Sequence, residues 1–216
     1  MDTKRYGLDD MVRAGCNDCK GCSGCCSGMG QSILLDPWDI WQLETNLKET
    51  FGGLLRDKIE LHVEEGLILP HLKMQGAEER CGFLNQEGRC SVHAFRPGLC
   101  RLFPLGRAYE GQTLQYFLLE NACPNGRTKV RVRKWLDIED SRNYTAFLIR
   151  WHDLRKRLQE EFAEKEAAEP DFMKEQNMRF LHIFYEEPYG PVDFYGQFEE
   201  RFTAFGGKHG RLDWEK

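Results

Sequence analysis

The sequence predicts a mainly α-helical protein with one short β-hairpin, irregular cysteine-rich loops that bind metal, and a helical C-terminal extension. All nine cysteines lie before residue 124, apolar residues recur at three- and four-residue steps over most of the second half, and residues 107–124 have the pattern of a hairpin. These observations divide the chain into a cysteine-cluster metal-binding domain, residues 1–137, and a helical extension, residues 138–216, that packs on it.

The first helix is expected to begin at Asp36. An aspartate is a favoured N-cap, Pro37 occupies the first helical position, and apolar residues follow at helical spacing as far as Leu47. Two helices are expected on either side of Gly52 and Gly53. The sequence therefore predicts a helical segment directly after the first group of cysteines.

Short strands are expected beside the later cysteines. Residues 67–72 contain a short apolar run, which Pro70 and His71 interrupt. Residues 107–124 predict a β-hairpin with its turn near Glu110 and Gly111.

The second half has a helical pattern. From residue 126 to 169, apolar residues including Trp151 recur at helical spacing with charged residues between them, and Pro170 interrupts the pattern. Residues 171–187 and 192–205 predict two further amphipathic helices. We expect most of their aromatic side chains to belong to the core, and this helical half to be the surface for any protein partner.

Composition excludes several classes of function. The formal net charge of −5 provides no basic excess for binding a phosphate backbone, so no nucleic-acid partner is expected. No run of 18 apolar residues occurs and the first residues lack the pattern of a secretory signal, so we expect a cytoplasmic protein without a membrane partner.

The cysteines favour a metal site over disulfides. Thiols stay reduced in the cytoplasm, and nine cysteines cannot pair completely within one chain. Residues 16–26, CNDCKGCSGCC, repeat a spacing of two intervening residues, which lets two sulfurs reach one ion at about 2.3 Å or bind irons of one cluster. Small residues between them allow backbone amides to approach the sulfurs.

The later cysteines have longer gaps. Cys81, Cys90 and Cys100 are separated by eight and nine residues, and Cys123 follows a hairpin. This spacing does not suit a zinc ribbon or finger alone, but it suits loops that fold back onto the first group. Part of the first group, C-x2-C-x2-C-x3-C, has ferredoxin spacing, with Ser27 in place of the following proline. Iron–sulfur ligation is therefore one interpretation.

The segments CKGCSGCC, DPWDI and CSVHAFRPGLCRLFP together resemble the CxxCxxCC, or YkgJ-type, cysteine-cluster family over roughly residues 15–137. The resemblance implies a zinc- or iron-chelating domain. The flagellin lysine methylases contain a similar cysteine domain, thought to hold an iron–sulfur cluster. By position, the ligands that the resemblance implies are Cys19, Cys22, Cys25, Cys26, Cys81, Cys90, Cys100 and Cys123.

Several neighbouring residues have open roles. Four roles are open for Cys16: a ninth ligand, an alternative ligand to Cys25 or Cys26, a free reactive thiol, or an ordinary surface residue. Arg96 and Arg101 flank Cys100 and either bind the cofactor, by offsetting thiolate charge, or form structural ion pairs. His93 is expected to support the site rather than ligate metal, and Phe103 is expected to pack over it.

Two hypotheses for function follow. The first is a cytosolic protein that holds an iron–sulfur cluster or multinuclear iron centre and serves electron transfer or an iron-dependent modification. The second is a zinc-stabilised structural module that binds another protein without catalysis. The sequence identifies no catalytic residue, and whether the protein is an enzyme stays open.

Overall fold

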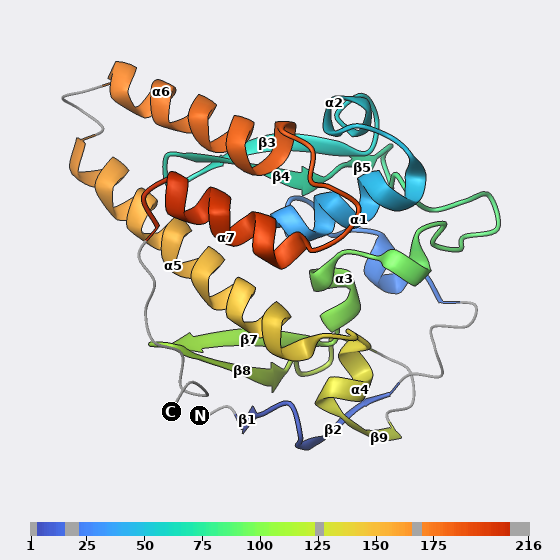
Figure 1. Ribbon diagram of the computed structural model, residues 1–216. Coiled ribbons are helices and arrows are strands. Elements are labelled where there is room, and N and C mark those ends of the chain that lie inside the picture. Colours follow the sequence, from blue (N-terminus) through green and yellow to red (C-terminus); the bar gives the residue numbers. More distant parts are fainter. Residues whose placement is uncertain (1–3, 16–21, 124–127, 166–169, 208–216) are drawn as a thin grey trace.

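The computed structural model describes residues 4–15, 22–123, 128–165 and 170–207. Helices account for 44% of the structure and strands for 23%, and the strands form several small antiparallel sheets (Figure 1). The predicted fold class, mainly α with one hairpin, is therefore wrong. The described chain mixes helices and strands because several short segments pair with partners that are distant in the sequence.

The described strands all lie before residue 132, with short helices among them, and only helices follow. The helices are η2 (Gly24–Cys26), α1 (Pro37–Leu47), α2 (Phe51–Leu54), η3 (His93–Phe95), α3 (Gly98–Leu102), α4 (Val132–Leu136), α5 (Ser141–Lys165), α6 (Pro170–Leu181), η4 (His182–Glu186) and α7 (Phe194–Ala204). The strands are β1 (Arg5–Tyr6), β2 (Met11–Gly15), β3 (Ile59–Glu64), β4 (Leu67–Leu72), β5 (Met74–Gln75), β6 (Arg80–Cys81), β7 (Leu105–Glu110), β8 (Thr113–Leu118) and β9 (Thr128–Arg131). Among these helices, none combines the length and the apolar character needed to cross a membrane.

The start of α1 and the predicted hairpin are confirmed. Asp36 caps α1 by accepting a hydrogen bond from the Asp39 amide at 3.0 Å, and Asp39 returns the bond in a capping box. Strands β7 and β8 pair directly, and Gly111 adopts a φ of 58° in the turn between them. Local signals were sufficient at both places because each element depends on adjacent residues.

The predicted pair of helices around Gly52 and Gly53 is wrong. Helix α2 contains both glycines, and the chain then enters the hairpin of β3 and β4. Residues 59–64 alternate apolar and polar side chains, which is the period of a strand. Glu65 and Gly66 both have positive φ, 49° and 81°, as a tight two-residue hairpin turn requires.

The helical pattern expected from residue 126 begins later than predicted. Residues 128–131 form β9, which pairs with β2 through Val12 and Val130. Helix α4 starts at Val132, whose amide donates to the Asp10 carbonyl at 3.0 Å. This pairing joins residues more than one hundred positions apart, so no local periodicity indicates it.

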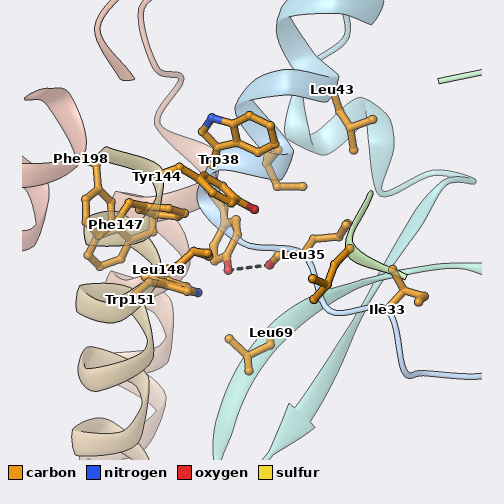
Figure 2. Close-up of a cluster of buried hydrophobic side chains, with 14 of the residues drawn as sticks. Ile33, Leu35, Trp38, Leu43, Leu69, Tyr144, Phe147, Leu148, Trp151 and Phe198 are labelled. Atoms are coloured by element: carbon orange, nitrogen blue, oxygen red, sulfur yellow. Dashed lines mark hydrogen bonds between the residues drawn. The ribbon is translucent and has the colours of Figure 1, made fainter. Parts of the chain in front are cut away.

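The helices of the second half share one apolar core with the first half. Trp38 of α1 packs against Tyr144 of α5 with ring centroids 5.0 Å apart, and Phe147 packs against Phe198 at 4.7 Å (Figure 2). Tyr185 donates a hydrogen bond to the Leu35 carbonyl at 3.0 Å. The aromatic residues of the second half are thus largely core, as predicted, while the domain boundary at residue 137 stays a prediction.

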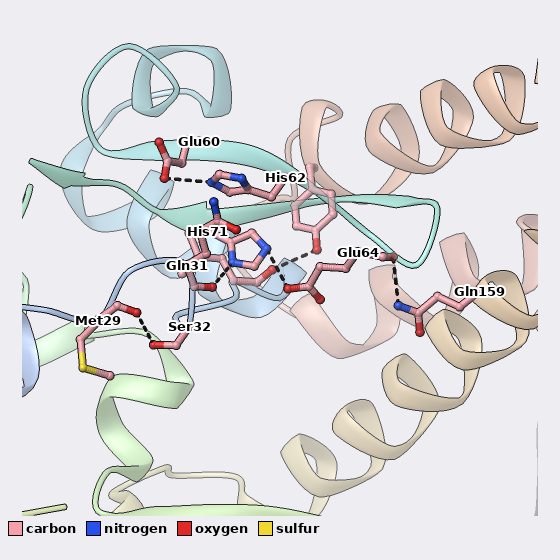
Figure 3. Close-up of polar contacts among 10 residues, drawn as sticks. Met29, Gln31, Ser32, Glu60, His62, Glu64, His71 and Gln159 are labelled. Carbon is pink, nitrogen blue, oxygen red and sulfur yellow. Dashed lines mark hydrogen bonds and ion pairs between the residues drawn. The ribbon is translucent and has the colours of Figure 1, made fainter. Parts of the chain in front are cut away.

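A buried histidine anchors the β3–β4 hairpin. His71 of β4 is fully buried, and its Nδ1 lies 2.6 Å from the Gln31 carbonyl oxygen, so Nδ1 carries the proton of this hydrogen bond (Figure 3). Its Nε2 lies 3.3 Å from a Glu64 carboxylate oxygen. Burial lowers the pKa of His71, and His62 lowers it further. The hydrogen bond to Gln31 and the carboxylates of Glu64 and Glu60 oppose this shift without cancelling it.

The lowered pKa of His71 makes stability depend on pH. The unfolded chain takes up this proton at higher pH than the folded chain, so stability is full above about pH 6.5 and falls as the pH decreases. His71→Asn keeps an N–H that can reach the Gln31 carbonyl but does not titrate. Urea unfolding at pH 7.5 and 5.5 should show a smaller loss of unfolding free energy in this variant than in the parent. His182→Asn, at an exposed position, is the control, and equal losses in all three proteins would contradict the assignment.

Candidate metal centre

Seven cysteines line one cavity of about 230 Å³. They comprise every cysteine among the described residues, and all seven are free thiols. They are Cys22, Cys25, Cys26, Cys81, Cys90, Cys100 and Cys123. The two other predicted ligands, Cys16 and Cys19, lie outside the described residues.

The first group of cysteines is held beside β6. Ser27 forms a β-bridge with Arg80, and the Gly28 amide donates to the Glu79 carbonyl at 3.0 Å. In this antiparallel register the residue before Ser27, Cys26, lies across from Cys81. A few backbone hydrogen bonds therefore join two cysteine segments that are more than fifty residues apart.

A tight loop returns the chain from Cys81 to Cys90. Leu84 forms a β-bridge with Cys90, and the Asn85 amide donates to the Arg89 carbonyl at 2.9 Å. Gly88 supports the turn with a φ of 68°, a conformation that glycine adopts without steric cost. The eight-residue gap in the sequence is thus closed by a hairpin-like turn.

The last two described cysteines come from α3 and from the end of the β7–β8 hairpin. Cys100 lies within α3. After β8, Asn121 adopts a positive φ of 58°, and the Ala122 amide donates to the Leu119 carbonyl at 3.5 Å. This turn brings Cys123, which is buried, to the wall of the cavity.

The thiols influence one another electrostatically. A hydrogen bond from Cys26 lowers the pKa of Cys25 to about 6, with a smaller contribution from Arg96, and the same hydrogen bond raises the pKa of Cys26. Burial raises the pKa values of Cys81, Cys90 and Cys100, and negative charge on neighbouring thiols raises each of them further. Several thiolates together are therefore unfavourable without a nearby cation.

This donor set fits a thiophilic metal. Thiolates are soft ligands that select zinc, iron–sulfur clusters and cuprous copper over magnesium or calcium. Within residues 4–15, 22–123, 128–165 and 170–207, no three potential ligands stand close enough to hold one ion as they are placed. The sulfurs instead surround a common space, and the cysteines could hold a metal group there.

The two predicted arginines occupy different positions. Arg96 lines the cavity, and its Nη1 lies 2.5 Å from His93 Nε2, which accepts the hydrogen bond. Arg101 is buried outside the set of lining residues. It donates to the carbonyls of Asp137 and Ala94, each at 3.1 Å, and so connects α3 to the end of α4 and to η3.

Apolar side chains complete the cavity wall. Phe103 lines it, as predicted, and so do Met74 and Trp135, which the sequence did not indicate. Trp135 of α4 is fixed by a hydrogen bond from its indole nitrogen to the Leu102 carbonyl at 3.2 Å. Its place beside the cysteines follows from the packing of α4 against α3, for which the sequence carries no local signal.

Comparison with known families gives one finding. Residues 18–124 match the family model of the CxxCxxCC domain, described as a "Putative zinc- or iron-chelating domain". No curated protein and no solved structure matches the chain. The matched range includes all seven cysteines of the cavity.

Removal of one cavity cysteine should reduce both metal content and stability. Cys22→Ser and Cys90→Ser each replace a thiolate by a hydroxyl, and metal binding in a site formed only on folding contributes to folding free energy. We expect less bound metal per chain by elemental analysis and a lower melting temperature. Ser23→Ala, next to Cys22, is the matched control. Unchanged metal content and melting temperature in both cysteine variants would contradict the ligand assignment.

Proposed function

We propose, from the membership of residues 18–124 in the CxxCxxCC family of zinc- or iron-chelating domains, that this metal-binding chain holds an iron–sulfur or multinuclear iron centre. Its cysteines would supply the thiolate ligands. The role that best suits such a centre is electron transfer or an iron-dependent modification.

The size of the cavity is the observation that carries this proposal. A four-coordinate zinc ion bonds its sulfurs at about 2.3 Å, which places them about 3.8 Å apart and leaves no space among them. The cavity has a volume of about 230 Å³ and seven cysteines in its wall, more than the four that one zinc ion takes. One water molecule occupies about 30 Å³ in the liquid, so this space accommodates a group of several atoms.

The surroundings of the sulfurs also support an iron centre. Iron–sulfur potentials depend on solvent exposure, net charge and hydrogen bonds to sulfur. Phe103, Trp135 and Met74 give the cavity a largely apolar wall. Arg96 places a positive charge near Cys25 and Cys90, where it adds to the lowering of the Cys25 pKa and partly opposes the rise that burial causes in the Cys90 pKa.

A bound iron centre would supply one-electron chemistry, and the chain would determine its environment. The cysteines bind the iron, Arg96 offsets negative charge, and the apolar wall limits access to solvent. These residues select and stabilise the centre without themselves reacting.

A zinc-stabilised structural module is the second candidate. The segments that carry Cys25, Cys26 and Cys90 are connected to the rest of the described structure by isolated β-bridges rather than long strands. A closed zinc site would stabilise such loops directly. The helical half of the chain would then bind a partner protein without chemistry at the metal.

Anaerobic purification separates the two candidates. We expect coloured protein with visible absorption, and iron together with acid-labile sulfide if the centre is a cluster. Zinc has a filled d shell and gives no such absorption. Elemental analysis, a sulfide assay and a visible spectrum of the same sample provide the measurement.

The control is a parallel sample exposed to air, because oxygen can remove a cluster before analysis. Colourless anaerobic protein with stoichiometric zinc and no iron would contradict the iron proposal and support the structural one.

A further inference from the structure

A buried carboxylate connects α1 to α3, the helix that carries Cys100. Asp39 is buried, with only 1% of its surface exposed to solvent. Its Oδ1 accepts a hydrogen bond from the Gly98 amide at 2.7 Å, and its Oδ2 accepts one from the Asp36 amide at 3.1 Å. One carboxylate therefore caps α1 and also fixes the first residue of α3.

Helix α3 depends on this contact for its position. It has five residues, Gly98–Leu102, so it is too short to be stable from its own hydrogen bonds. Pro97 precedes it, and no side chain caps its N-terminus locally. Asp39, 59 residues earlier in the sequence, supplies the acceptor for its first amide.

Cys100 lies two residues after this anchored amide. Because the intervening backbone is helical, a shift of Gly98 moves Cys100 with it. Burial raises the pKa of the Asp39 carboxyl group well above its usual value, and in its ionised form this group contributes to the raised pKa of the Cys100 thiol. The carboxylate is thus close to the cysteine without touching the cavity, since Asp39 is not among its lining residues.

Tyr144 of α5 and Arg107 of β7 also pack against Gly98. A Cβ at this position would collide with the hydroxyl of Tyr144 from α5 and would lie 2.7 Å from Arg107 Nη2 of β7. Arg107 in turn donates to the Tyr144 hydroxyl at 2.8 Å. Gly98 therefore packs closely against the Asp39 carboxyl group and the Tyr144–Arg107 pair, with no space for a side chain.

We propose that Asp39 is a positioning residue for the metal centre: by accepting the hydrogen bond of the Gly98 amide, where Gly98 packs against the Tyr144–Arg107 pair, it sets the place of the Cys100 sulfur in the cavity wall. The proposal rests on metal binding by the cysteines and holds for iron or zinc. It makes α1 and α5 parts of the support of the centre.

The test is Asp39→Asn in the full chain, purified without oxygen together with the metal that it binds during expression. An amide keeps one acceptor but turns an NH₂ group toward one of two backbone donors, leaving a buried N–H unpaired. We expect metal release to a colorimetric chelator to be about tenfold faster or more. Asp36→Asn is the matched control, because asparagine is an equally good N-cap and its oxygen can still accept from Asp39.

A double-mutant cycle with Cys100→Ser distinguishes positioning from a general loss of stability. If Asp39 acts through Cys100, the double variant should release metal no faster than Cys100→Ser alone. Release from Asp39→Asn at the parent rate, or effects of the two substitutions that multiply, would overturn the proposal. Metal identity is measured separately on the parent, so zinc in place of iron would contradict the proposed function and leave this inference standing.

Gly98→Ala provides a second variant should Asp39→Asn fail to fold. Its Cβ displaces α3 without altering the carboxylate, so it should also accelerate release in the parent and add nothing to Cys100→Ser. Parent-like release from this variant, or an effect that multiplies with that of Cys100→Ser, would likewise overturn the proposal.

Discussion

The close approach of seven buried or half-buried thiols around one cavity is the constraint on which this structure depends. Ionised sulfurs at such positions repel one another, and burial makes each negative charge more costly. A bound cation would offset both penalties, and the cysteines that held it would join segments of the chain that are far apart in the sequence. Metal binding of the kind described for the matching family model would therefore be coupled to the folding of the cysteine loops.

The rest of the fold supplies rigid walls for these loops. The aromatic core under α1, α5 and α7 is continuous, so the short elements that carry cysteines rest on a well-packed base. Buried polar contacts then fix individual elements on that base. Asp39 holds α3, Arg101 joins α3 to η3 and the end of α4, and His71 holds the β3–β4 hairpin to Gln31. Each is a single side chain that bonds the backbone of a distant segment.

The arrangement of the cysteines around this cavity bears on whether it would hold an iron centre or zinc. Seven sulfurs, a partly apolar wall and two lining arginines, Arg89 and Arg96, provide an environment that could hold a redox centre. Of these arginines, Arg96 acts on the pKa values of Cys25 and Cys90. The same sulfurs could close around zinc only by moving together. The short bridges that hold Ser27 to Arg80 and Leu84 to Cys90 would have to allow that movement.

The sequence by itself determined the chemistry and the strictly local elements. Soft thiols in repeated pairs indicated metal, Asp36 and Pro37 indicated the start of α1, and the residues around Gly111 indicated a hairpin, because each signal is complete within a few positions. The tertiary structure alone decided that β2 pairs with β9 and that Trp135 lines the cavity while Arg101 does not. It also decided that Asp39, expected only at the start of a helix, bonds α3. These features depend on contacts between residues far apart in the chain, and local spacing carries no information about which distant partner a strand or a buried carboxylate will meet.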